Sequence, residues 1–288
     1  MFWPFLLALH VLIGNLFATW LIKKLASQPQ RSGMLLLQYA ILALVAGALS
    51  VVYPQSLTWQ VQLPIIILGA LNSLACFAQW RAMEISVSRA ALFSVCDDLV
   101  AMLLAYLVLG EGREVSAPMI VGIVLCFCSS MLIAAGSGVG GRLLSSRLLI
   151  WVAVYSLIWG LVPVAMRASA TEFAISGIGF MALWYLGSLL GSVVIWSTLR
   201  KGEPALPSKV FPMVLLLAGA VLASKYLCYL LLTQLTVLSL QPILQLTEMI
   251  VPFLLGVLVF KERVEHSARG WISVGLGICG VLLIAVSL

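Results

Sequence analysis

Ionisable residues inside long apolar stretches are the part of this sequence best suited to chemistry. Asp97, Asp98 and Glu248 interrupt two such stretches, and Lys225 lies within a third. A charge at the centre of a bilayer is costly, so residues of this kind usually bind a substrate, an ion or one another. Three acids that face one base cannot all be ionised at low dielectric constant without compensation. These residues predict a site for a proton or for the cationic group of a substrate.

Further polar and aromatic side chains lie at helical spacing from these charges or in neighbouring apolar stretches. We add to the candidate site His10, Asn72, Gln79, Gln241, Gln245, Tyr155, Trp159 and Tyr229. The aromatic rings are suited to stack on a ligand ring or to hold a cation. For the four amides, hydrogen bonding between helices is an equal alternative to substrate contact, and for His10 packing is the favoured interpretation.

Helices that cross a membrane must position these residues. The chain has 288 residues, of which 63% are hydrophobic and 9% are charged, whereas soluble proteins are roughly 25% charged. This composition excludes a soluble enzyme, a disordered protein and a nucleic-acid-binding protein. A bilayer core about 30 Å thick needs about 20 apolar residues per helix. We therefore predict an all-α integral membrane protein with ten transmembrane helices, over residues 5–22, 34–53, 63–82, 88–109, 117–135, 148–168, 174–199, 212–232, 240–260 and 268–287.

The depth of the charged residues follows from these spans. With a rise of about 1.5 Å per residue, Asp97 lies about 14 Å and Glu248 about 12 Å inside their helices, near the middle of the bilayer. Lys225 falls at a depth similar to that of Glu248, so the two could form an ion pair. Ala90, Ser94, Ala101 and Ala105 share the helix face of Asp97. Small residues mark contacts between membrane helices, which turns that face inward.

The two halves of the chain repeat each other. At an offset of 151, positions 95–134 match positions 246–285 at 14 of 40 residues, and Asp97 falls on Glu248. Each half has five predicted spans, and an odd number turns the second half upside down in the membrane. Inverted repeats are the architecture by which many transporters achieve alternating access. The two repeats are predicted over residues 1–140 and 141–288.

The basic residues predict an orientation. Of the 16 Lys and Arg residues, 13 lie in loops after odd-numbered spans, 2 lie in the opposite loops, and Lys225 lies within a span. Because basic residues collect in cytoplasmic loops, both termini are predicted outside the cytoplasm.

Two stretches carry a family resemblance. Ser88 to Glu114 and Leu240 to Glu265 each place a polar-tipped apolar helix before a Glu in a short turn, with a glycine-bearing helix after it. The sixth span adds Trp159-Gly160 with Arg167, and Gly14 with Lys23 is a looser copy. The chain resembles the drug/metabolite transporter superfamily, EamA type.

This resemblance implies ten spans in two halves, located in the bacterial cytoplasmic (inner) membrane. It also implies that spans 1–4 and 6–9 surround a central cavity, while the fifth and tenth act as scaffold. Many members are described with cytoplasmic termini, and here the charge distribution predicts the opposite orientation.

The leading functional prediction is a secondary active transporter that exports a small organic solute such as an amino acid, an amine or a related metabolite. Proton exchange or the solute's own gradient would drive it. No G-x-x-x-x-G-K-[ST] loop is present, which argues against ATP hydrolysis. The alternative is a flippase or carrier of a lipid or lipid-linked precursor, although an acidic cavity fits a phosphate headgroup poorly.

An enzyme, a metal site and a cofactor are not expected. The sequence has neither H-E-x-x-H nor G-x-S-x-G, and His10 is the histidine that a Ser–His site within the membrane would have to use. The six cysteines lie in apolar stretches without a C-x-x-C pair, which favours packing.

Two further motifs have structural interpretations. The Gly187-x-x-x-Gly191 motif predicts close packing within the bundle rather than a dimer face. The turn acids are expected to be solvated residues or helix caps, and they are Glu111, Glu114, Glu262 and Glu265.

Overall fold

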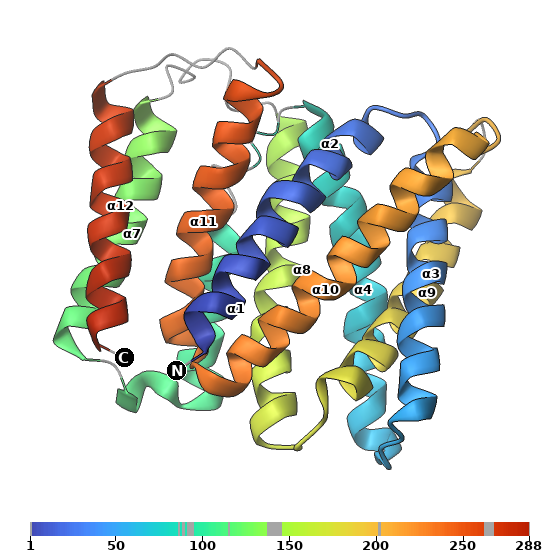
Figure 1. The fold of residues 1–288 in the computed structure, drawn as a ribbon, viewed down its shortest axis with the longest axis horizontal. Coiled ribbons are helices and arrows are strands. Elements are labelled where there is room, and N and C mark those ends of the chain that lie inside the picture. Colours follow the sequence, from blue (N-terminus) through green and yellow to red (C-terminus); the bar gives the residue numbers. More distant parts are fainter. Residues whose placement is uncertain are drawn as a thin grey trace.

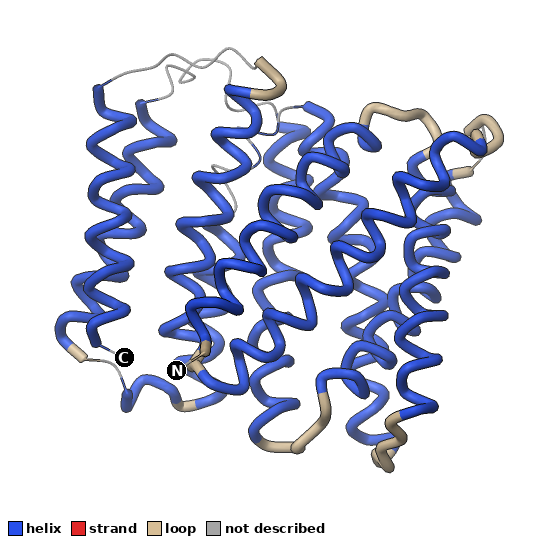
Figure 2. Tube along the Cα trace, in the orientation of Figure 1, coloured by secondary structure: helices blue, strands red, loops and turns tan. Residues whose placement is uncertain are grey.

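The structure, a computed structural model, describes residues 2–85, 87, 90, 95–114, 116–136, 146–200, 203–261 and 268–287. These residues form helices joined by short loops, and no strand occurs among them (Figure 2). Helices suit a chain this apolar because they satisfy every backbone N–H and C=O within one segment.

The first predicted span is one continuous rod of three segments: α1 (Trp3–His10), a π-helical segment η1 (Val11–Ala18) and α2 (Thr19–Ala26). The other long helices are α3 (Arg31–Val52), α4 (Trp59–Ile85), α6 (Val95–Leu104), α7 (Ala117–Gly136), α8 (Ser146–Thr171), α9 (Gly177–Leu199), α10 (Phe211–Gln234), α11 (Val237–Leu258) and α12 (Ala268–Ser287). The short segments are η2 (Ala105–Leu109), which continues α6, and η3 (Glu111–Glu114) and η4 (Ser208–Val210).

Among the described residues, seven helical segments are long and apolar enough to cross a membrane. They are Trp3–Ala26, Arg31–Val52, Trp59–Ile85, Leu148–Thr171, Gly177–Leu199, Ser208–Gln234 and Val237–Gly256. Two shorter apolar helices cover Ala117–Ser129 and Gly275–Ile284. The chain is therefore an all-α, multi-pass membrane protein. The predicted span over 88–109 includes residues outside the described part, Ser88 and Ser94 among them.

The helices form a bundle in which α7 and α12 lie side by side at one edge (Figure 1). Their backbones approach closely, because a Cβ atom added at Gly122 or at Gly280 would lie 2.7 Å from the carbonyl oxygen of the other. Ser129 faces Gly277 further along, so residue numbers rise on α7 as they fall on α12. The two helices are therefore antiparallel.

At the opposite side of the bundle, α9 packs against α3 and α4. Cβ atoms added at Gly187 and at Gly191 would meet the backbone of α4, at Ile66 and Ala70 respectively. The prediction that these glycines serve packing within the bundle is confirmed. The chain ends marked N and C lie at the same end of the molecule (Figure 1).

Candidate functional site

A cavity of about 180 Å³ lies between the helices. Residues of the first rod and of α3, α4, α6, α8, α9, α10 and α11 line it, together with Ala90. Within the part of the chain that the structure describes, α7 and α12 contribute no lining residue. The edge pair therefore lies beside the cavity and supports the helices that enclose it.

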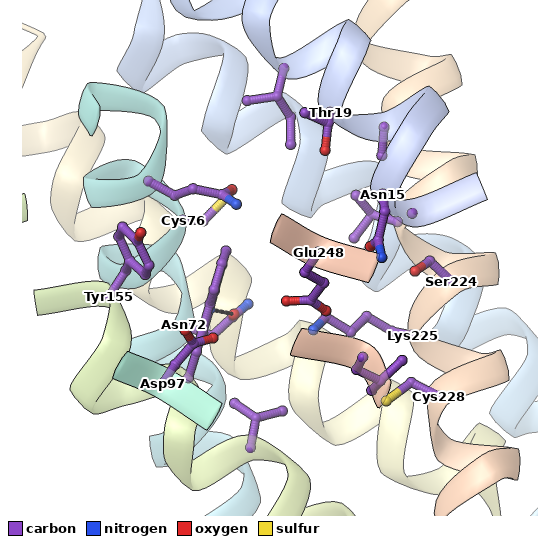
Figure 3. A pocket seen from close by; sticks show the side chains of 18 of the residues that line it. Asn15, Thr19, Asn72, Cys76, Asp97, Tyr155, Ser224, Lys225, Cys228 and Glu248 are labelled. Carbon is purple, nitrogen blue, oxygen red and sulfur yellow. Dashed lines mark hydrogen bonds between the residues drawn. The ribbon is translucent and has the colours of Figure 1, made fainter. Parts of the chain in front are cut away.

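Three charged side chains from three helices point into the cavity: Asp97 of α6, Glu248 of α11 and Lys225 of α10 (Figure 3). Asp97 is buried, and Glu248 and Lys225 are partly buried. The charge of Lys225 interacts with both carboxylates, and the carboxylates interact with each other. Among the described residues no ion pair joins Lys225 to Glu248. The two charges therefore interact at longer range, without direct contact between the side chains.

Lys225 contacts an aromatic ring instead. Its Nζ lies 5.6 Å from the centroid of the Trp159 ring. A cation within about 6 Å of a ring centroid is attracted by the ring face. The ring of Tyr155 lies 5.6 Å from that of Trp159, centroid to centroid, and the Tyr155 hydroxyl donates to the carbonyl of Ala90 at 3.2 Å.

Asn72 joins three helices to α4. Its Nδ2 donates to the Tyr39 hydroxyl at 3.0 Å and to Ser188 Oγ at 3.1 Å. Its Oδ1 accepts from Trp159 Nε1 at 2.9 Å. Both N–H groups of the amide are thus engaged. Hydrogen bonding between helices therefore explains the role of Asn72 better than contact with a substrate does.

His10 of the first rod and Ser224 of α10 face each other. The Nδ1 atom of His10 lies 2.9 Å from the Ser224 carbonyl oxygen and 3.2 Å from Ser224 Oγ. A carbonyl oxygen can only accept, so the shorter contact requires a proton on Nδ1. His10 then has no lone pair on that atom to activate the serine.

Nine of the twelve candidate residues line the cavity: Asp97, Glu248, Lys225, Asn72, Gln79, Gln241, His10, Tyr155 and Trp159. The other three do not. Asp98 accepts from Gln241 Nε2 at 2.7 Å, and Gln245 is fully buried. The Tyr229 hydroxyl donates to the Ile175 carbonyl at 2.6 Å, away from the cavity.

Several lining residues were not singled out from the sequence: Asn15, Thr19, Gln38, Tyr39, Tyr185 and Ser224. Gln38-Tyr39 of α3 and Trp184-Tyr185 of α9 occupy similar places in their helices, and the rings of Tyr39 and Tyr185 lie 6.4 Å apart. The signal that could have found the lining residues is their polar character within otherwise apolar stretches.

Some buried polar atoms without a partner among the described residues lie elsewhere in the bundle, and five belong to residues that line the cavity. These five are Asp97 Oδ1, Gln38 Oε1, Gln241 Oε1, His10 Nε2 and the Tyr185 hydroxyl. Buried polar groups are normally hydrogen-bonded to protein, ordered water or a ligand. The five atoms on the lining residues are therefore available to a ligand or to water in the cavity.

Glu111 is not the solvated turn residue that the sequence allowed. It is 8% exposed, its Oε1 lies 3.4 Å from Arg167 Nε, and its Oε2 accepts from the Leu238 backbone N–H at 3.2 Å. Leu238 lies in the first turn of α11, so Glu111 caps a helix distant in sequence. The side chain of Glu114 and residues Glu262 and Glu265 lie outside the described part.

The described residues hold no group of three or more His, Cys, Asp or Glu side chains placed to bind a metal ion. Cys76 and Cys228 line the cavity, and no disulfide bond occurs among the described cysteines.

No protein-family model matches the sequence, and no curated protein matches it. Solved structures do match, with 26 chains similar in fold. One of them, a crystal structure of a protein, superposes with a TM-score of 0.71 at 16% sequence identity, over 98% of this chain and 96% of that chain. At this identity the similarity shows the fold alone, over nearly the whole length of both chains.

Proposed function

We propose that the protein is a secondary active transporter of a small organic solute, and that the central cavity binds this solute. The observation that carries the proposal is the meeting of Asp97, Glu248 and Lys225, from three helices, in one cavity. Charged groups at membrane depth that line a cavity typically belong to substrate or ion pathways.

The proposal includes ten spans in two inverted halves of five. Cys126 Sγ lies 3.8 Å from the Gly277 carbonyl oxygen, and these residues correspond to each other at the offset of 151 seen in the sequence. Contact between equivalent residues of two similar units is what a two-fold axis produces. Since α7 and α12 are antiparallel, this axis would lie perpendicular to both helices, in the membrane plane.

Hydrogen bonds in the two halves support the same symmetry. Lys23 Nζ donates to the Met83 carbonyl near the end of α4 at 3.0 Å, and an Arg167 guanidinium nitrogen donates to the Leu232 carbonyl near the end of α10 at 2.7 Å. Each donor belongs to the first helix of its half, and each acceptor belongs to the third.

The cavity chemistry supports a small polar solute. Two carboxylates face one ammonium, so a proton or a cationic group is needed to balance the charge. The volume of about 180 Å³ is below the roughly 300–1,000 Å³ of pockets for drug-sized ligands. Both features favour an amino acid or amine over a lipid or a lipid-linked precursor.

We propose transport rather than catalysis because the contact between His10 and Ser224 does not let the histidine act as a base toward the serine. The proton on His10 Nδ1 points to the Ser224 carbonyl, and a serine nucleophile needs a base with a free lone pair. We therefore assign His10 to helix–helix hydrogen bonding.

The lining of the cavity also supports membership of the drug/metabolite transporter superfamily. The resemblance implied a cavity without contributions from the fifth and tenth spans, and no lining residue comes from α7 or α12 in the described chain. We further propose export from the cytoplasm across a bacterial inner membrane, with both termini outside.

The test begins with a thermal-shift screen of the purified protein against amino acids, amines and lipids, because a ligand that binds the folded state raises its stability. The best stabiliser is then followed as a labelled solute in liposomes with an imposed pH gradient. We expect saturable transport that falls at least about tenfold in Asp97→Asn and in Glu248→Gln, since each removes a cavity charge.

The control is Glu172→Gln, which neutralises an exposed carboxylate at the end of α8 and should transport like the wild type. Full transport by Asp97→Asn, at the same folded amount in the liposomes, would contradict the proposed role of the cavity.

A further inference from the structure

The ring of Trp159 is held in place independently of any ligand. Its Nε1 donates to Asn72 Oδ1 at 2.9 Å, and Asn72 is itself fixed by Tyr39 and Ser188. A ring anchored from three helices presents a preorganised face to the cavity. Preorganisation of this kind favours binding because little freedom is lost when a ligand arrives.

The face of this ring holds the ammonium of Lys225, at 5.6 Å from the centroid. In the described part of the chain, Lys225 Nζ makes no hydrogen bond and no ion pair within 4.0 Å. Its charge interacts with Asp97 and Glu248 at longer range. A flexible lysine stem without a short polar contact can swing away at low cost.

The remaining polar groups of the cavity are mostly acceptors. The unpartnered atoms Asp97 Oδ1, Gln38 Oε1 and Gln241 Oε1 can accept but cannot donate while the carboxylate is ionised. A ligand that satisfies these three acceptors must carry several N–H donors. A ligand carboxylate would add acceptors to a cavity that already has an excess of them.

We propose that the Lys225 ammonium lies at the place where the ammonium group of the substrate binds. A substrate amine would displace Lys225 from the Trp159 face and from the two carboxylates. Lys225 is then an internal competitor and not an anchor for a substrate carboxylate. This inference rests on the proposed function, because it takes the molecule bound in the cavity to be the transported one.

Two matched pairs of probes distinguish the roles of Lys225. Isopentylamine differs from leucine, and 2-phenylethylamine from phenylalanine, by the absence of the carboxylate. Dissociation constants are measured by titration calorimetry on the purified protein. We expect Lys225→Gln to bind an amine about tenfold more tightly than the wild type, because the competing charge is gone.

The amino acids should bind more weakly than their amines in both proteins. The control is Lys209→Gln, which removes an exposed lysine and should leave every dissociation constant unchanged. If Lys225→Gln loses the amino acids while the amines bind as before, Lys225 is a carboxylate anchor and the proposal is overturned. Failure of both amines to bind either protein also overturns it.

A second variant covers the case in which Lys225→Gln does not fold. Lys225→Arg keeps the charge, and a guanidinium stacks on an aromatic face more strongly than an ammonium does. It should bind the amines more weakly than the wild type, and unchanged or tighter binding would contradict the proposal. Amine binding in detergent without transport in liposomes would count against the proposed function alone.

Discussion

At the scale of single residues, Glu111 stabilises helices that do not belong to its own stretch of chain. One carboxylate oxygen caps the N-terminus of α11 at Leu238, and the other pairs with Arg167, which donates to Leu232 near the end of α10. The first N–H groups and the last C=O groups of a helix have no partner within that helix. Glu111 and Arg167 together satisfy such groups on both sides of the turn between α10 and α11.

We expect Glu111→Gln to lower the stability of the folded protein by about 1–3 kcal/mol. A neutral amide still accepts from Leu238, but it no longer balances the charge of Arg167, which is 19% exposed. The measurement is thermal unfolding in detergent, with Glu172→Gln as the exposed control. Equal melting temperatures for the two variants would show that the buried contact contributes little.

The charged residues of the cavity were predicted from the sequence, whereas some of the polar residues that line it were not. Asp97, Glu248 and Lys225 stood out because ionisable groups are rare at membrane depth. Gln38 and Tyr39 did not, since a polar residue in a span is as often a link between helices. The role of Asn72 could not be predicted from the sequence either, because only the structure shows which helices its amide joins.

At the scale of helices, small residues set the distance between α4 and α9. A Cβ atom at Gly187 would meet the backbone of Ile66 and Ala70, and one at Gly69 would meet the backbone of Trp184. Ser188 Oγ donates to the Gly69 carbonyl at 2.9 Å across the same contact. Close backbone approach through glycine is a common basis for association of membrane helices.

Gly187→Ala should therefore destabilise the protein by about 1–3 kcal/mol, because the added methyl group meets backbone that cannot move aside. The matched control is Gly219→Ala in the interior of α10, where an added Cβ has no neighbour within 4 Å. That change should be neutral or stabilise the helix by up to about 1 kcal/mol. Thermal unfolding of both variants checks the difference, and an equal effect would refute the close contact.

The helices themselves were largely predictable. At the ends that the structure describes, predicted and observed boundaries differ by at most four residues, because long apolar runs between polar loops define spans directly. The π-helical segment Val11–Ala18 was not predicted. It presents Gly14, Asn15 and Ala18 to the cavity, and its wider turn is stabilised by neighbouring helices rather than by a local sequence signal.

At the scale of the whole molecule, the chain ends lie at one end of the bundle (Figure 1). An even number of spans requires this arrangement, and the basic residues of the loops favour the opposite end for the cytoplasm. Lys23 and Lys24 lie in the last turn of the first rod, and Lys209 lies in η4 directly before α10. All three lie at helix ends that the charge distribution assigns to the cytoplasm.

Single cysteines introduced into a variant without the six natural ones test this orientation. Phe2 and Val286 are 64% and 85% exposed, and Lys209 is exposed near the opposite end. A membrane-impermeant maleimide should label Phe2→Cys and Val286→Cys in intact spheroplasts, and Lys209→Cys only after permeabilisation. The cysteine-free variant provides the background. Labelling of only one of the two terminal positions would contradict an even number of spans, whereas exchange of the whole pattern would reverse the orientation and leave the span number intact.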